Sequence, residues 1–136
     1  MFDDDEIAYL RSQRLARLAT VDADGQPTVD AVGFAFTDGV FTIGSRADMR
    51  ATRKGRNIEA GNTHVSLIVD DLASVDPWRP RGIRVHGEAE VTDIDGQFGP
   101  GTYVVVHPTI TWSWGIAERH DFDAQRRFRP TRREWT

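Results

Sequence analysis

Hydrophobic and polar positions alternate with a period of two along much of this chain, which is the pattern of half-buried β-strands. The clearest example is residues 82–93, where Ile83, Val85 and Val91 are separated by charged or polar side chains. The same pattern predicts further strands over residues 15–21, 28–36, 40–44, 64–70 and 102–115. Turns rich in Gly, Asp and Pro separate these runs, so consecutive strands are expected to form antiparallel hairpins.

Two segments predict helices instead of strands. Asp3 and Glu6 have the spacing of a capping box, so we expect a helix over residues 2–13. Residues 48–60 contain no proline, and their apolar side chains recur at intervals of three to four before a Gly-Asn pair. We therefore expect this second segment to be one short helix.

Together these elements predict a mainly β (α+β) protein, a closed or nearly closed antiparallel barrel of six to seven strands with short flanking helices. With 136 residues, of which 39% are hydrophobic, the chain is long enough for one such domain. We expect the barrel to span residues 1–117. Residues 118–136 are polar, arginine-rich and poorly periodic, and we expect them to form a separate C-terminal tail.

Composition excludes several classes of protein. A net charge of −4 argues against a general nucleic-acid-binding protein, and the absence of cysteine excludes disulfides and thiolate metal sites. The acidic N-terminus differs from a signal peptide, and no apolar run approaches the ~18–20 residues of a membrane span. We expect a cytoplasmic protein that binds neither nucleic acid nor membrane. No metal site is expected, because close ligand pairs are absent among the histidines, His64, His86, His107 and His120.

One basic segment stands out in this acidic chain. Four arginines and the only lysine fall within residues 46–56, together with a single acid. In a continuous helix, positions 50, 53, 54 and 57 would lie on one face. Such a row of cations suits a phosphate, because each charge-assisted hydrogen bond to it contributes roughly 1.5–3 kcal/mol. The alternative is a solvated basic helix without a ligand.

Tryptophans mark two further stretches. Trp78 lies between two prolines and next to Arg79, in a stiff loop that suits a planar ligand or a partner subunit, or that plugs the end of the barrel. Trp112 and Trp114 fall on one face of a strand, a pattern typical of a core or a dimer interface. No P-loop, GxSxG or GxGxxG motif in a suitable context is present, so covalent hydrolysis has no support.

The order of these segments resembles one family. An N-terminal helix followed by "LARLATVDADGQPTVDAVGFAF", "FTIGS", "RATRKGRNI" and "HVSLIVDD" is similar to the split β-barrel flavin and deazaflavin proteins of the pyridoxamine 5'-phosphate oxidase-like superfamily. The stretch "VDDLASVDPWRPRGIRVHGEAEV" followed by "WSWGI" is similar to the branch that uses coenzyme F420. The resemblance covers residues 5–116 and leaves out the C-terminal tail.

This resemblance implies an FMN-binding-type split barrel that forms a homodimer, with the cofactor in a groove between the two barrels. In the family, the strand end and the basic helix after it hold the phosphate and acidic tail of the cofactor. Matched by motif, the corresponding residues are Ser45, Arg50, Arg53, Lys54, Arg56 and Asn57. The early strands usually line the ring system, which here implies Thr20, Gln26, Pro27, Val32, Gly33 and Phe34, with Trp78 as a further cofactor contact.

The resemblance also implies hydride transfer between reduced F420 and a small conjugated or planar organic substrate. Such a protein binds and orients its cofactor and excludes water, so the absence of an acid–base motif is expected. The catalytic residues are unknown, and Tyr103, His107 or a water molecule could supply the proton. Two alternatives share the fold: an FMN-dependent oxidase or reductase, and a non-catalytic flavin or deazaflavin carrier. Five cations fit the larger negative charge of F420 better than the single phosphate of FMN.

Overall fold

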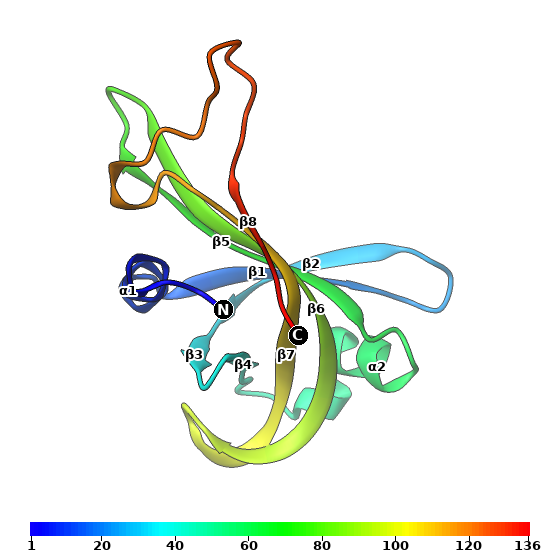
Figure 1. The fold of residues 1–136 in the computed structure, drawn as a ribbon. Helices are drawn as coiled ribbons and strands as arrows, with labels where there is room; N and C mark the ends of the chain where they lie inside the picture. Colours follow the sequence, from blue (N-terminus) through cyan, green and yellow to red (C-terminus); the bar gives the residue numbers. More distant parts are fainter.

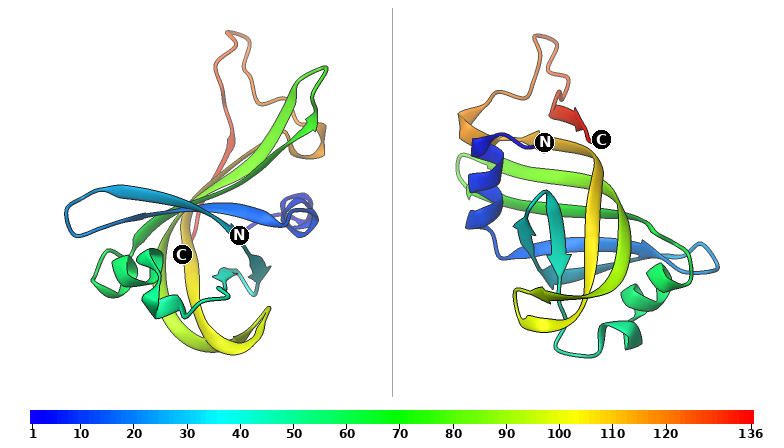
Figure 2. Two further views of the ribbon diagram at one scale, coloured as in Figure 1. Left: turned by 180° about the vertical axis from the view of Figure 1, so that it is seen from behind. Right: turned by 60° about the horizontal axis from the view of Figure 1, so that its bottom comes forward.

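Eight antiparallel strands form one curled sheet in the computed structural model, which describes residues 1–136 (Figure 1). Along this sheet the strand order is β2-β1-β5-β6-β7-β4-β3, and β8 pairs with β7. The strands are β1 (Leu15–Val21), β2 (Pro27–Gly33), β3 (Ala35–Thr37), β4 (Val40–Ile43), β5 (His64–Ser74), β6 (Arg79–Gly96), β7 (Gly99–Trp114) and β8 (Thr131–Glu134). Figure 2 shows that the long strands β6 and β7 bend around the barrel and form much of its wall.

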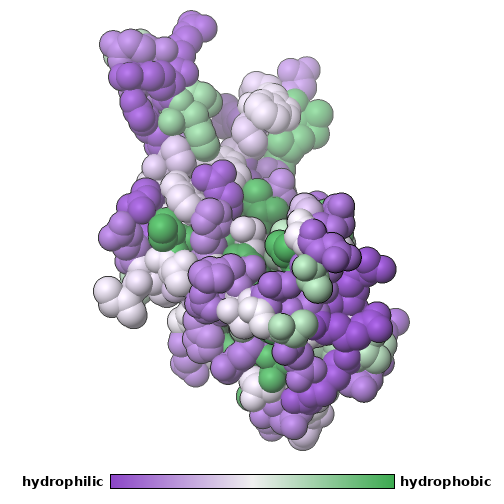
Figure 3. All heavy atoms as spheres, turned by 90° about the vertical axis from the view of Figure 1, so that its right-hand side faces the viewer, coloured by the Kyte–Doolittle hydropathy of each residue, from purple (hydrophilic) through white to green (hydrophobic).

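Burial alternates along β1 and β5 and through much of β6, which confirms that the period-two pattern marks half-buried strands. The inward side chains of the strands, together with buried residues of the helices and turns, form a core of 19 buried residues, which includes Leu18, Phe41, Ile83 and Val104. The face shown in Figure 3 is mostly hydrophilic, with hydrophobic residues scattered across its middle and on the projecting lobes. Neither α-helix has the length and apolar character needed to cross a membrane.

The predicted strand over residues 28–36 is interrupted at Phe34. β2 ends at Gly33 and pairs with β1, whereas β3 begins at Ala35 and pairs with β4. These two strands are adjacent in sequence but lie at opposite ends of the strand order, so the chain crosses the opening of the barrel between them. The Phe34 ring packs 6.0 Å from that of Phe41, which places the connection against the core.

The first predicted helix is confirmed as α1 (Asp4–Ser12), together with its capping box. The Asp3 carboxylate accepts a hydrogen bond from the backbone N–H of Glu6, and the Glu6 carboxylate accepts one from the N–H of Asp3, both at 2.9 Å. These bonds satisfy two N–H groups that have no partner within the helix.

The single helix predicted over residues 48–60 is wrong. The segment forms a 3₁₀ turn, η1 (Met49–Ala51), and a separate helix, α2 (Arg53–Glu59). Thr52 between them is extended, and its hydroxyl donates to the Met49 carbonyl and accepts from the Gly55 N–H. A Cβ at Gly55 would collide with the Met49 carbonyl, so only glycine permits this close approach of turn and helix.

The segment 118–136 contributes β8 to the sheet and so is not a tail separate from the barrel. Arg133 on β8 donates to the Glu6 carboxylate at 2.8 Å, and Glu6 is only 1% exposed. The hydroxyl of Ser113 donates to the other oxygen of this carboxylate at 2.7 Å. Trp135 packs edge-on against Phe2, with ring centres 4.9 Å apart. The two ends of the chain are therefore fastened together.

Candidate functional site

A hollow of about 370 Å³ lies on the outer face of the sheet, across β1, β5, β6 and β7. The small residues Ala19 and Ser66 lie opposite each other on β1 and β5, and Ser66 lies opposite His86 on β6. Because small side chains cover little of the backbone, a flat ligand can approach the sheet closely here. The hollow is also lined by Thr20, Val21, Pro27, His64, Val65, Gly87, Thr109 and Ile110.

Two of the residues predicted to line a ring system, Thr20 and Pro27, border this hollow. Gln26 lies in the adjoining turn, and its side-chain amide donates to the Pro27 carbonyl at 2.9 Å. These three residues are therefore brought together at one end of the β1–β2 hairpin.

The other three lie at the opposite end of that hairpin. Pro27 pairs with Val21, whereas Gly33 pairs with Leu15, six positions earlier in β1. At about 3.3 Å per residue, the two ends are separated by about 20 Å. Of this far group, Val32 is buried in the core and Phe34 packs against it. The structure thus does not bring Val32, Gly33 and Phe34 into the hollow.

Helix α2 is attached to the end of β1 that borders the hollow. The Asn57 side chain donates to the Thr20 hydroxyl at 3.0 Å, with residue exposures of 7% and 1%. After the helix, the Asn62 side chain donates to the Val21 carbonyl at 3.0 Å. Asn57 and Thr20 therefore fix the helix against the strand, and their buried polar groups satisfy each other.

Three cations of α2 have no acidic or hydrogen-bonding side-chain partner in the chain. Arg53 and Arg56 are exposed, and Lys54 is half-buried. Arg46, in the loop before η1, is also exposed and unpaired. These four positive charges lie within eleven residues of sequence and are available to an anion.

Arg50 is placed differently, so the predicted row of positions 50, 53, 54 and 57 is wrong. Its guanidinium lies 3.3 Å from both Glu59 and Asp93 and donates to the Thr102 hydroxyl at 3.1 Å. The pKa of Asp93 is lowered, first by the hydrogen bond from Thr102 and then by that from Arg50. Arg50 therefore joins η1 and α2 to the β6–β7 wall.

Ser45 borders a second hollow, of about 270 Å³, between the loop after β4 and the β6–β7 turn. Its hydroxyl accepts the N–H of Ala47 at 3.1 Å. Tyr103 lines the same hollow, but it is buried, and its hydroxyl donates to the Gly99 carbonyl and accepts the Phe98 N–H. Of the two predicted proton donors, only His107 is exposed, with its imidazole 3.8 Å from Glu90.

Trp78 lies far from α2, at the tip of the β5–β6 hairpin that projects at the upper left of Figure 1. It is 69% exposed. The loop of the C-terminal segment beside this hairpin carries Phe122 and Phe128, also exposed, with ring centres 5.7 Å apart. Within one chain, the structure does not bring Trp78 to the hollow.

Sequence reasoning missed a cluster beside the hollow. The Arg84 guanidinium lies over the Trp112 ring, with Cζ 4.5 Å from the ring centre. The His86 ring packs edge-on against the same indole at 4.8 Å. Alternation already places Arg84 and His86 on the polar face of β6. Alternation does not predict the register between β6 and β7. A bulge at His86–Gly87 shifts this register and places Arg84 opposite Trp112.

The curled antiparallel sheet, with a hollow on its outer face and a basic helix bonded to the end of β1, places the chain among the split β-barrel proteins. The chain belongs to the pyridoxamine 5'-phosphate oxidase family, whose model matches residues 3–102.

Three relatives show the extent of this similarity. The 5a,11a-dehydrotetracycline/5a,11a-dehydrooxytetracycline reductase of Streptomyces rimosus is 36% identical over 121 residues, which cover 85% of this chain and 84% of that protein. The solved structure of an F420 reductase is 28% identical and has a TM-score of 0.62, covering 82% of this chain and 98% of its own. A conserved hypothetical protein of Mycobacterium tuberculosis shows the fold alone, at 23% identity and a TM-score of 0.66 over 85% of this chain and 86% of its own.

Proposed function

We propose that this protein is an oxidoreductase that transfers a hydride between reduced coenzyme F420 and a small planar or conjugated organic substrate. The observation that carries the proposal is the group of unpaired cations on α2, namely Arg53, Lys54 and Arg56, in a helix bonded to the end of β1 that borders the hollow. In a chain of net charge −4, cations without an internal partner favour an anionic ligand. The reductase relatives support an oxidoreductase.

The charge of the cofactor favours F420 over FMN. F420 carries a phosphodiester and a γ-linked glutamate tail, whereas FMN carries one phosphate. Four unpaired cations, Arg46 and the three of α2, match the larger negative charge. The F420 reductase of similar fold supports the same choice.

The residues present fit such a cofactor. Ala19 and Ser66 give the ring system close access to the sheet, and α2 provides the charges for the tail. The Thr20–Asn57 hydrogen bond fixes the helix relative to the strand, so both parts of the site keep one geometry. When bound, F420 supplies the hydride. His64 and His86 both line the hollow, and the His64 imidazole lies 3.1 Å from the Glu88 carboxylate. The His86 imidazole is the one that can hold a proton there without a carboxylate partner, whereas the Tyr103 hydroxyl is already bonded.

The proposal includes a homodimer, in which a second copy covers the open side of the hollow and excludes water. Val29, which lies opposite Ala19 at the edge of the hollow, is 65% exposed in the single chain. Together with Pro27 and Ile110, which line the hollow, Val29 gives its rim an apolar surface that a second copy can cover.

Titration of the cofactor-free protein with F420 and with FMN at moderate salt tests the cofactor. We expect tight binding of F420 and weak binding of FMN, and the reverse order would refute the choice of F420. Stopped-flow oxidation of bound reduced F420 by a panel of enones and quinones then tests the activity. If no acceptor accelerates the oxidation beyond that of free cofactor, the protein is a carrier and not a reductase.

A further inference from the structure

A row of side chains crosses five strands of the outer face just beyond the hollow. Strand pairing places each member directly opposite the next, and residues opposite each other in antiparallel strands point to the same face. The row consists of Arg17, Ile68, Arg84, Trp112 and Arg132. A second row on the same face borders the hollow and consists of Ala19, Ser66, His86 and Ile110. The two rows are two residues apart along each strand, which is a distance of about 7 Å.

Arg84 is the one arginine of this row without a carboxylate partner. Arg17 pairs with Asp70 at 2.6 Å, and Arg132 pairs with Glu134 at 3.0 Å. Arg84 is exposed and lies over the Trp112 ring instead. A guanidinium stacked on an indole keeps its N–H donors free at the edge, where they can bind an anionic oxygen.

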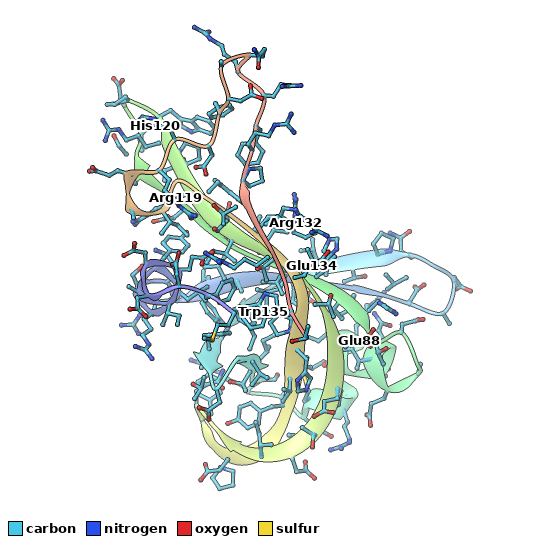
Figure 4. All side chains as sticks on the ribbon, viewed as in Figure 1. Glu88, Arg119, His120, Arg132, Glu134 and Trp135 are labelled. Atoms are coloured by element: carbon cyan, nitrogen blue, oxygen red, sulfur yellow. The ribbon has the colours of Figure 1, made fainter.

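The C-terminal segment forms the other side of this cluster. In the β7–β8 pair, Trp112 lies opposite Arg132, and Ile110 lies opposite Glu134. Figure 4 shows Arg132 and Glu134 along β8 and Trp135 near its end, where β7 and β8 run side by side. The bond from Arg133 to buried Glu6 holds β8 in place, so the indole is flanked by guanidinium groups on both neighbouring strands.

We propose that Arg84, His86 and Trp112 form a platform for the substrate, and that this substrate is a planar fused-ring compound with an ionised hydroxyl, a phenolate or an enolate. The flat ring stacks on the exposed Arg84 guanidinium, which the half-buried Trp112 ring supports, and the N–H groups of Arg84 pair with the ionised oxygen. The inference rests on the proposed function, because it takes this anion to be the compound that is reduced. Binding to the platform itself requires no cofactor.

A second copy of the chain is the competing occupant of this row. In a two-fold interface centred here, the same arginines of both copies would face each other, which like-charge repulsion opposes. An anion meets no such opposition, because it supplies the negative charge that Arg84 lacks. Charge complementarity therefore favours a small anion.

The test compares two probes that differ by one methyl group, 2-hydroxy-1,4-naphthoquinone, which is an anion at neutral pH, and its neutral methyl ether. Their dissociation constants are measured by equilibrium dialysis with the cofactor-free full chain. The chain contains no cysteine, so no thiol can capture the quinone. We expect the anion to bind about tenfold more tightly than the ether.

Arg84→Gln should weaken binding of the anion about tenfold and leave the ether unchanged, because it removes one charge-assisted hydrogen bond. Arg17→Gln is the matched control: the same substitution in the same row, at an arginine already paired with Asp70. It should change both affinities less than about twofold. Equal losses in the two variants, or equal binding of the two probes to the wild type, would overturn the platform.

Trp112→Leu should weaken the binding of both probes about fivefold or more, because it removes the aromatic ring of the platform. If this variant instead turns a dimer into a monomer while anion affinity is unchanged, a second copy occupies the row and the proposal is overturned. Titration with F420 distinguishes a failure of the platform from a failure of the proposed function. Arg84→Gln should bind F420 as the wild type does, and a wild type that selects the anion but does not bind F420 refutes the proposed function while leaving the platform intact.

Discussion

The two halves of the basic segment use the same residue types in different ways. Arg50 in η1 contacts Glu59, Asp93 and Thr102, so the chain itself neutralises its charge. A few residues later, the cations of α2 have no such partner. The difference arises because Arg50 in η1 reaches the β6–β7 wall, whereas Arg53 and Arg56 lie on the exposed side of α2.

The same division recurs in the row on the outer face. Arg17 and Arg132 have carboxylate partners, and Arg84 has none. Arginines paired with a carboxylate of the chain have donors already in use, whereas unpaired arginines are available to ligands. The role of a cation thus depends on its partners in space more than on its neighbours in sequence.

The largest expected effect concerns the open charges. Arg53→Ala combined with Lys54→Ala should raise the dissociation constant of F420 at least 100-fold, because each lost charge-assisted hydrogen bond costs roughly 1.5–3 kcal/mol. The fold should remain intact, since Arg53 is exposed and neither side chain has an internal bond. Cofactor titration and thermal unfolding measure the two effects. Unchanged affinity with a lower melting temperature would mean that these cations are structural.

The next effect concerns the most deeply buried partner of an arginine. Glu6→Ala should lower the free energy of unfolding by about 3 kcal/mol, because it removes the acceptor of the buried Ser113 hydroxyl and leaves Arg133 with Asp3 as its one remaining carboxylate partner. Urea unfolding measures the loss. Glu6→Gln is the control, because it keeps an acceptor for the Ser113 hydroxyl and should cost less. A Glu6→Ala protein as stable as the wild type would contradict the division between paired and open arginines.

Acid should weaken the ion pair between Arg81 and Asp71. Arg81 donates two hydrogen bonds to Asp71, and these are the main reason that the pKa of Asp71 lies below its ordinary value. Tyr9 donates to the same carboxylate, and burial followed by this bond raises the pKa of the tyrosine. Because the folded-state pKa of Asp71 is depressed, the cluster contributes fully above the unfolded-state value of about 3.9, and the contribution falls as pH drops through the folded-state pKa.

Asp71→Asn checks this pH dependence. The variant should be less stable than the wild type by about 1–2 kcal/mol at pH 7, a figure reduced for partial exposure. The difference should shrink as the pH approaches 3. Urea unfolding at pH 7, 5 and 3 measures it, and a difference that stays constant or grows on acidification would rule out the assigned role of the carboxylate.

The smallest effect is expected at Arg50. Arg50→Gln should change the affinity for F420 less than threefold, because the guanidinium is already occupied by Glu59 and Asp93. The pKa of Asp93 should rise toward its ordinary value, although the stronger influence of Thr102 remains. NMR titration of Asp93 together with cofactor titration checks both points. A large loss of F420 affinity would mean that Arg50 binds the cofactor as the unpaired cations of α2 are proposed to do.

Local patterns predicted the parts of the fold that depend on neighbouring residues. Strand β1 occupies the predicted residues 15–21, and the capping box of α1 forms between Asp3 and Glu6. The break at Thr52 was missed, because a threonine that caps a new helix looks the same in sequence as one inside a helix. β8 was missed because its inward residues, Thr131 and Arg133, are polar, so it shows no hydrophobic alternation.

The candidate site was predictable in composition but not in arrangement. The basic segment is visible in the sequence, but the partners of Arg50 are not, since Asp93 and Thr102 lie 43 and 52 positions away. The pairing of Arg84 with Trp112 depends on a bulge between β6 and β7 that alternation does not reveal. The partners of Arg50 and the pairing of Arg84 both depend on strand register, and that register is determined by the pairing of the whole sheet.

The bond between Glu6 and Arg133 has a consequence for the order in which the protein is assembled. The two residues are 127 positions apart, and Ser113 is 107 positions from Glu6. Helix α1 leaves the ribosome first, yet its carboxylate meets a guanidinium only when β8 has been synthesised. The earliest element of the nascent chain is therefore among the last to complete its contacts, and a chain stalled before β8 exposes both the Glu6 charge and one edge of β7.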